Sequence, residues 1–322
     1  MVPSSTAPVR NDWHRAVARS IFDAIHAAFG NGRFRHYPSR LKANSRPANA
    51  SPETVPMARS ALLNVMVAAA TKAGRSLTRD FGEVAQLQVS VKGPGDFVSA
   101  ADTRAEDICL EMLTKARPGY SFLMEERGAV KGDPDHRWII DPLDGTTNFL
   151  HSIPLFCVSM ALEVRGELRA GVIYNPIMEE LFTVERGQGA FMNDRRIRVA
   201  GRKRMAECVI AGGVPTLSKR DHGAALVQQR HVMGEVAGYR TTGASAISLA
   251  WTAAGRFDGY YEAGLQPWDV AAGILLLREA GGFASEPDPK ASIYETGRIV
   301  AGNEYVHKQL REIINRPIPK GS

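Results

Sequence analysis

The chain has 322 residues, of which 44% are hydrophobic and 23% are charged, a composition typical of a globular protein with a full core. Its three cysteines are odd in number, lie far apart and form no Cys-x-x-Cys pair, which favours reduced core thiols in a cytoplasm over a disulfide framework. The formal net charge is +6, but residues 1–56 hold eight basic and three acidic residues, so residues 57–322 carry only +1, which argues against direct nucleic-acid binding by the body of the protein.

The first 56 residues differ in character from the rest. They contain scattered Arg, Pro, Ser and Ala, and one short amphipathic stretch from Trp13 to Phe29 that would form a marginal helix. They lack the continuous apolar segment and cleavage site of a signal peptide, and no apolar run in the chain reaches the ~18 residues of a membrane span. We expect residues 1–56 to be a disordered or misannotated N-terminal extension, and residues 57–322 to form the folded domain.

Helical and strand patterns begin near residue 59. Apolar residues recur on one face over 59–80, which predicts a helix with one buried face. Residues 89–91 alternate as in a short strand, which the sequence Lys-Gly-Pro-Gly at 92–95 ends. Asp102 then stands at the start of a helix expected over 102–116, where it would serve as a cap or a first-turn acid.

Two carboxylates enter a turn in the middle of the chain. An apolar run in the segment 137–149 leads to Asp141 and Asp144, whose hard oxygen atoms are ligands that magnesium prefers. Pro142 stiffens the turn, Gly145 permits a backbone conformation or close approach that a Cβ would block, and the amides that follow could bind phosphate at a helix start. The pattern predicts a metal site beside a phosphate site, although Asp-Pro and Asp-Gly also occur in ordinary turns and an Asp before Thr-Thr can simply cap a helix.

The second half of the chain contains a meander followed by alternating strands and helices. Apolar and polar residues alternate in three neighbouring stretches, 156–164, 168–175 and 181–185, which indicates antiparallel strands. Further on, a strand is expected over 209–213, helices over 222–234 and 243–254, and a helix that opens at Trp268-Asp269. Asp269 alone could be only a favourable acid at a helix N-terminus.

Four motifs in order carry a resemblance to a known family. They are Gly-Asp-Phe-Val-Ser-Ala-Ala-Asp at 95–102, Glu125-Glu126, the Asp141 to Thr147 turn and Trp268-Asp269. From about Met57 onward the sequence resembles the inositol monophosphatase family, most closely its bacterial members. The resemblance implies an α+β fold, a layered αβαβα sandwich of the sugar-phosphatase type. Inositol monophosphatases and fructose bisphosphatases share this fold. The resemblance also implies a homodimer.

The resemblance also implies a site for two or three magnesium ions. Glu125, Asp141 and the carbonyl of Leu143 would hold one ion, and Asp141, Asp144 and Asp269 would hold the second. Glu125 would share in a third ion. Four acids from separate segments converge only if cations neutralise their mutual repulsion.

Catalytic and substrate-binding residues follow from the same resemblance. Glu125 and Thr146 would orient or deprotonate the attacking water, and Asp102 would support the metal cluster and its waters. Lys92 is similar in position to a lysine near the active site, and Arg240 to a residue at the substrate mouth or subunit contact. The residues expected to contact the substrate are Asp144, Gly145, Thr146, Ser245, Glu262 and Asp269.

Several functions remain open. Glu262 and the Lys-Gly-Pro-Gly-Asp-Phe-Val-Ser sequence favour magnesium-dependent hydrolysis of inositol monophosphate to inositol and phosphate. Fructose 1,6-bisphosphate, histidinol phosphate and 3′-phosphoadenosine 5′-phosphate are alternative phosphomonoester substrates within the resemblance. A non-enzymatic alternative is a regulator of ribosomal RNA synthesis that binds the transcription machinery, as some bacterial relatives do.

Overall fold

A computed structural model describes residues 59–84, 89–93, 96–213 and 222–317. The prediction about residues 1–56 lies outside these residues and stays a prediction. At residues 90–93 and 96–98 the backbone is described and the side chains are not, so the role expected of Lys92 is untested as well.

The N-terminal half builds one large sheet with two helices on it. Along the chain, α2 (Ala61–Phe81) comes first, then a hairpin of β1 (Val89–Gly93) and β2 (Asp96–Ser99), and then α3 (Ala100–Ala116). The sheet has eight strands in the order β10-β9-β8-β7-β6-β5-β3-β4. Their bounds are β3 (Tyr120–Met124), β4 (Gly128–Val130), β5 (Asp133–Asp144), β6 (Cys157–Val164), β7 (Glu167–Asn175), β8 (Glu180–Glu185), β9 (Gly189–Met192) and β10 (Arg195–Arg196), with the short α4 (Thr146–Leu150) between β5 and β6.

The C-terminal half adds a five-stranded sheet in the order β12-β11-β13-β15-β14. β11 (Val209–Gly212) runs parallel to both β12 (Gly238–Arg240) and β13 (Gly259–Ala263), and β15 (Arg298–Gly302) runs antiparallel to β13 and to β14 (Phe283–Ser285). The remaining elements are η2 (Met205–Glu207), α5 (His222–Met233), α6 (Ser245–Ala253), α7 (Pro267–Glu279), α8 (Ile293–Thr296) and α9 (Glu304–Ile314).

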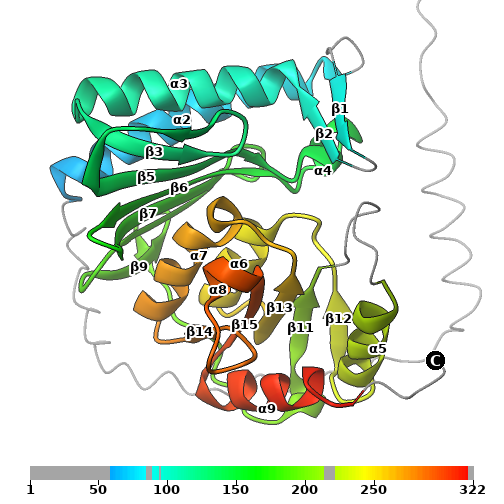
Figure 1. Ribbon diagram of the computed structural model, residues 1–322. Coiled ribbons are helices and arrows are strands. Elements are labelled where there is room, and N and C mark those ends of the chain that lie inside the picture. The colour runs from blue at the N-terminus through cyan, green and yellow to red at the C-terminus, as the bar shows by residue number, and fades with distance from the viewer. Residues whose placement is uncertain (1–58, 85–88, 94–95, 214–221, 318–322) are drawn as a thin grey trace, which may run out of the picture. The chain divides into compact units, whose positions relative to one another are not determined.

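Helices and sheets alternate in layers from residue 59 onward (Figure 1). α2 and α3 cover one face of the large sheet, and α6 and α7 lie between its other face and the five-stranded sheet. α5 and α9 cover the outer face of that second sheet. This order of layers is the αβαβα sandwich expected from the sequence.

Apolar side chains fill the spaces between the layers. One cluster lies between α2, α3 and the large sheet and includes the fully buried Trp138. A second cluster joins the large sheet, α6, α7 and the five-stranded sheet around the fully buried Tyr260. Because truncating a buried aromatic side chain costs roughly 3–5 kcal/mol, these two clusters fix the position of β5 relative to α7, and both elements carry acids of the candidate site.

The structure corrects several local expectations. Residues 96–99, for which no element was predicted, form β2, and α3 begins at Ala100, not at 102. Ser99 is therefore the N-cap of α3 and Asp102 its third residue, so Asp102 is a first-turn acid and not the cap. The short β12 and the C-terminal α9 were not predicted, because three residues carry no period and α9 follows its strand after a single residue.

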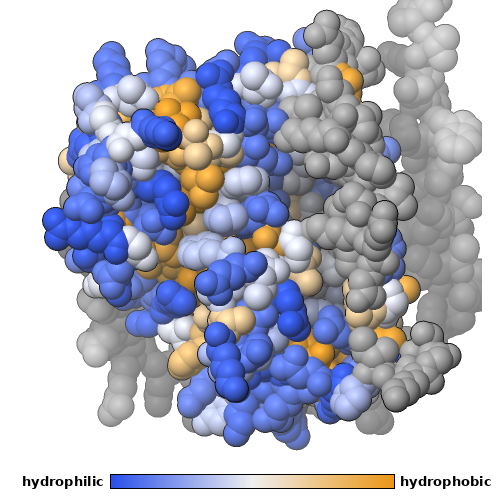
Figure 2. Space-filling view, viewed as in Figure 1, coloured by the Kyte–Doolittle hydropathy of each residue, from blue (hydrophilic) through white to orange (hydrophobic). Residues whose placement is uncertain are grey.

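The described surface is largely polar. On the face in Figure 2 the hydrophilic residues dominate and the apolar ones form small separate areas. Among the described helices none is both long enough and apolar enough to cross a membrane.

Candidate functional site

The turn after β5 can be made only with glycine. Gly145 has φ of +94°, in the left-handed region, and precedes α4. A Cβ on Gly145 would lie 2.8 Å from the carbonyl oxygen of Leu155 and 3.2 Å from the Cβ of Ala244. The expected reasons for a glycine here, positive φ and close backbone approach, are both confirmed.

Asp144 is the last residue of β5, and its buried carboxylate lies at the first turn of α6. Its carboxylate accepts hydrogen bonds from the backbone N–H groups of Ser245 (3.2 Å) and Ala246 (2.8 Å), and the buried thiol of Cys157 donates to it at 3.7 Å. Burial and the negative charge of Asp269 raise the pKa of Asp144 from 3.8 to about 7, against the opposing effect of the two backbone donors. The first turn of α6 thus holds the carboxylate in place but does not neutralise it.

Asp141 is the acid around which the other acids gather. It is 2% exposed and accepts a hydrogen bond from the N–H of Leu143 at 3.0 Å. Burial raises the pKa of Asp141 well above its ordinary value, and the charges of Glu125, Asp144 and Asp269 raise it further. A hydrogen bond with the Glu125 side chain raises this pKa as well. The structure therefore brings together the four acids that were expected to meet.

Asp269 is positioned by the first turn of α7. Its carboxylate accepts the N–H of Gln266 at 2.7 Å in a capping box, and Pro267 occupies the first turn. The interpretation of Asp269 as an acid at a helix N-terminus is therefore confirmed. The same side chain raises the pKa of Asp141 and Asp144, so the helix cap also places a negative charge beside both acids.

Asp102 connects α3 to the central turn. It is fully buried, and its Oδ2 accepts hydrogen bonds from the N–H (2.8 Å) and the hydroxyl (2.6 Å) of Ser99. The hydroxyl of Thr146 lies 3.1 Å from Asp102 Oδ1 and 3.1 Å from the carbonyl oxygen of Leu143. Burial raises the pKa of Asp102, and the hydrogen bonds from Ser99 and Thr146 lower it in part. Asp102 and the Leu143 carbonyl together orient the Thr146 hydroxyl.

Sequence reasoning missed Glu106, which positions the Glu125 loop. Glu106 is fully buried on α3, and its carboxylate accepts the N–H of Glu126 at 2.9 Å and pairs with Arg127 at 3.3 Å. Burial raises the pKa of Glu106. The adjacent N–H of Glu125 donates to the carbonyl of Ile140 at 3.2 Å, so the loop is tied both to α3 and to β5. The sequence indicated a role for Glu106 only in that a charged residue lies on the buried face of a predicted helix.

A second polar group surrounds Glu262 on β13. The buried hydroxyl of Tyr260 donates to Glu262 Oε2 at 2.5 Å, and the Ser245 hydroxyl lies 3.5 Å from the same oxygen. A Cβ on Gly213 would lie 1.8 Å from the Glu262 carboxyl carbon, so the chain after β11 approaches Glu262 without a side chain. Since Ser245 also donates its N–H to Asp144, the Glu262 group adjoins the acids. The structure places Arg240 at the exposed end of β12.

The donor set fits a hard divalent cation. It offers carboxylate oxygens and the Leu143 carbonyl oxygen and no sulfur or nitrogen, which is the ligand type that magnesium takes. Within the described parts of the chain, no three Asp, Glu, His or Cys side chains surround a common point in metal-binding geometry. The observation that favours a cation is therefore the mutual effect on pKa, with the buried Asp141 and Asp144 destabilised by the charges of their acidic neighbours.

Comparison with known proteins matches the chain to one family. The model of the inositol monophosphatase family matches residues 58–320. An inositol-1-monophosphatase of Mesorhizobium japonicum is 62% identical over 263 residues, which are 81% of this chain and 99% of that protein. A protein of Escherichia coli strain K12 named Nus factor SuhB is 40% identical over 250 residues, which are 77% of this chain and 94% of that protein.

A solved structure is similar as well. The crystal structure of extragenic suppressor protein suhB from Bartonella henselae has 56% sequence identity and a TM-score of 0.78, and the match covers 80% of this chain and 100% of that one. The likeness confirms the layered α/β fold.

Proposed function

The chain belongs to the inositol monophosphatase family, and from that premise we propose that it hydrolyses inositol monophosphate to inositol and phosphate with the help of magnesium. The single observation that carries the proposal is the convergence of four acids from three parts of the chain: Glu125 after β3, Asp141 and Asp144 on β5, and Asp269 on α7. The other three lie within electrostatic reach of Asp141. An arrangement that costs stability in this way is typical of a functional site.

The proposed ligands of two or three magnesium ions are Glu125, Asp141, the Leu143 carbonyl, Asp144 and Asp269. Bound there, the ions would lower the pKa of a water molecule and stabilise the negative charge of the phosphate and the leaving alkoxide. The hydrogen bonds from α6 to Asp144 and within α7 to Asp269 support the assignment, because they hold both carboxylates in one orientation before any ion binds.

The chain itself would supply water orientation and phosphate binding. The Thr146 hydroxyl, held by Asp102 and the Leu143 carbonyl, would orient the attacking water together with the Glu125 carboxylate, which would accept its proton. The backbone amides of Gly145 and Thr146 would donate to the phosphate oxygens, as turn amides do in phosphate sites. No side chain of the chain needs to form a covalent intermediate.

Glu262 and Ser245 are the proposed contacts to the hydroxyl groups of the substrate. A carboxylate accepts two or more hydrogen bonds and so suits a polyol with neighbouring hydroxyls. The hydrogen bond from Tyr260 fixes Oε2 of Glu262, which also lies 3.5 Å from the Ser245 hydroxyl, so the carboxylate is oriented beside Ser245.

The first test is phosphate release from a panel of phosphomonoesters, with and without magnesium. We expect magnesium-dependent release with a preference for inositol 1-phosphate. A preference for fructose 1,6-bisphosphate, histidinol phosphate or 3′-phosphoadenosine 5′-phosphate would retain the mechanism and replace the substrate. A folded protein that releases phosphate from none of them would overturn the proposal.

A regulatory role is the second candidate, because several relatives near 40% identity carry the name Nus factor SuhB. A partner in the transcription machinery would bind independently of the acids. We expect an Asp144→Asn variant, inactive as a phosphatase, to retain any such partner in a pull-down. If wild-type and variant protein both retain no transcription protein, this role is excluded.

We also propose a homodimer in the cytoplasm. The three cysteines are free and buried, which supports a reducing compartment. Light scattering of the purified chain checks the subunit number, with a mass near 70 kDa expected from twice the 35.0 kDa of one chain.

A further inference from the structure

A strongly basic segment, residues 195–204, begins with β10 and ends just before η2. Its sequence, Arg-Arg-Ile-Arg-Val-Ala-Gly-Arg-Lys-Arg, holds six cations and no acid. Because residues 57–322 carry only +1 in total, the rest of this body carries −5. The low overall charge of the body therefore conceals one local concentration of positive charge.

The backbone of the basic segment is fixed to the fold at several points. The side-chain amide of Asn303 donates to the carbonyl oxygens of Ala200 (2.8 Å) and Arg202 (2.7 Å), and that of Gln309 donates to the carbonyl oxygen of Lys203 at 3.1 Å. The N–H of Val199 donates to a carbonyl oxygen in the loop after α7 at 3.2 Å. A line of cations held in this way loses little conformational entropy when it binds a ligand.

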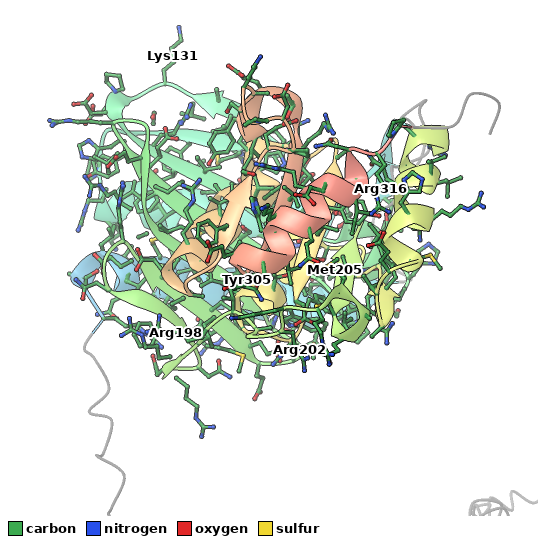
Figure 3. All side chains as sticks on the ribbon, turned by 90° about the horizontal axis from the view of Figure 1, so that it is seen from below. Lys131, Arg198, Arg202, Met205, Tyr305 and Arg316 are labelled. Atoms are coloured by element: carbon green, nitrogen blue, oxygen red, sulfur yellow. The ribbon has the colours of Figure 1, made fainter. Side chains whose placement is uncertain are left out.

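Apolar residues of the segment point inward and the cations outward. Ile197 is 9% exposed and Met205, just beyond the segment, is 6% exposed. All six basic side chains are exposed: Arg195, Arg196, Arg198, Arg202, Lys203 and Arg204. In the view from below, Arg202 and Met205 lie near Tyr305 of α9, and Arg198 lies farther away on the same side (Figure 3).

Acidic neighbours neutralise only part of this charge. Arg202 pairs with the buried Asp258 at 3.1 Å, and Arg204 pairs with Glu207. Among the described residues no carboxylate forms an ion pair with the other four cations, which are Arg195, Arg196, Arg198 and Lys203. Ordinary surfaces intersperse both signs of charge, so four cations of one segment without an acidic partner indicate an anionic partner.

The shape of the charge distribution favours a linear polyanion. The segment contains no helix, and an extended stretch of ten residues spans at most about 35 Å, so its cations follow one backbone track. Tyr305, which is 48% exposed, lies beside the line with Lys203 Nζ 4.3 Å from its ring centre. Cations along a backbone track with an exposed aromatic ring are the features of single-stranded nucleic-acid sites. We propose that residues 195–204, with Tyr305, bind single-stranded RNA.

The test compares three full-length proteins for binding a fluorescent single-stranded RNA at several salt concentrations. The test variant is Arg195→Glu, Arg198→Glu, Lys203→Glu. The control variant, Lys72→Glu, Arg75→Glu, Lys115→Glu, has the same net charge and changes exposed cations on α2 and α3. Both variants keep residues 1–56, so any binding by that basic region is common to all three proteins.

We expect the test variant to bind at least ten-fold more weakly than the wild type at low salt, with the control close to the wild type. Three lost phosphate contacts should reduce the slope of log K against log salt by about 2, at about 0.7 per phosphate on a single strand. Equal weakening in both variants, unchanged binding in the test variant, or equal binding of duplex RNA of the same length would overturn the proposal. Circular dichroism of each variant confirms that it is folded, and none of these measurements depends on phosphatase activity.

Discussion

Replacing Asp144 by Asn should abolish phosphate release and, without metal, remove much of the pH dependence of folding stability. Asn keeps the shape of the side chain and one acceptor for the α6 amides, but it cannot ionise and it binds divalent cations weakly. The loss of activity and the change in stability have one cause, which is the removal of a charge held beside other acids.

The size of the stability effect follows from the raised pKa of Asp144. Its pKa is about 7 in the folded chain, against 3.8 for an unperturbed Asp. Between these two pH values the folded state keeps a proton that the unfolded state has lost, so the free energy of unfolding falls as pH rises through this window. At 1.36 kcal/mol per pKa unit, the total decrease is about 4 kcal/mol, and it is complete above pH 7.

Chemical denaturation in a chelator between pH 4 and pH 8 measures this decrease. We expect the curve of the Asp144→Asn variant to be flatter than the wild-type curve by up to about 4 kcal/mol over this range. Asn has one oxygen fewer to accept hydrogen bonds from the α6 amides, which lowers the free energy of unfolding by about 1–3 kcal/mol. This loss is the same at every pH, so it does not alter the slope. Asp194→Asn, at an exposed acid paired with Arg59, is the matched control and should keep the wild-type slope.

Magnesium should restore wild-type stability at pH 8 and have little effect on the Asp144→Asn variant, because a ligand that binds only the folded state stabilises it. Identical pH slopes for wild type and variant would refute the electrostatic argument. Phosphatase activity of the variant at saturating magnesium would refute the assignment of Asp144 as a metal ligand.

Three further substitutions test neighbouring parts of the site. Glu106→Gln keeps an acceptor for the N–H of the Glu125 loop but loses the ion pair with Arg127. We expect it to raise the magnesium concentration needed for half-maximal activity several-fold. An unchanged magnesium titration would exclude a positioning role for Glu106. Gly145→Ala should lower both Tm and activity, because an alanine at φ of +94° costs roughly 1–2 kcal/mol and its Cβ would meet a carbonyl oxygen at 2.8 Å. Gly166→Ala, with φ of +77° and open space around the added Cβ, measures the backbone strain alone. Equal losses of Tm in the two variants would rule out a contribution from the clash. Tyr260→Phe should raise KM for inositol 1-phosphate about ten-fold, because it removes a hydrogen bond to the Glu262 carboxylate. KM for p-nitrophenyl phosphate, which has no ring hydroxyls, should not change. A parallel change in KM for both esters would contradict this role of Glu262.

The parts of the site that were predictable from sequence are those with a local signature. Asp141, Asp144 and Gly145 lie within five residues, and the chemistry of a turn limits what such a group can do. Asp269 could be expected at a helix start from local sequence alone. That it meets Asp141 depends on how α7 packs on the large sheet, and only the resemblance to a family made that meeting predictable.

The residues that were missed act through long-range packing. Glu106 lies on α3 and its partners lie in the loop after β3, and nothing in either segment indicates the other. Cys157 begins a strand as an ordinary apolar residue, and only the pairing of β6 with β5 places its thiol beside Asp144. Periodicity identifies which face of an element is buried, but it does not identify which other element covers that face.

The arrangement of the acids explains why so much of the fold converges on this turn. Four carboxylates that repel each other need separate supports, because a single flexible segment would let them move apart into solvent. Asp141 and Asp144 lie at the end of a strand buried between two cores, and the first turns of α6 and α7 hold Asp144 and Asp269 by backbone donors. Stability from the two cores thus offsets a local electrostatic cost, and the same cost is what a divalent cation would relieve on binding. A chain that lost the cation requirement could gain stability by replacing these acids, so their presence together is itself an argument for the metal-dependent function.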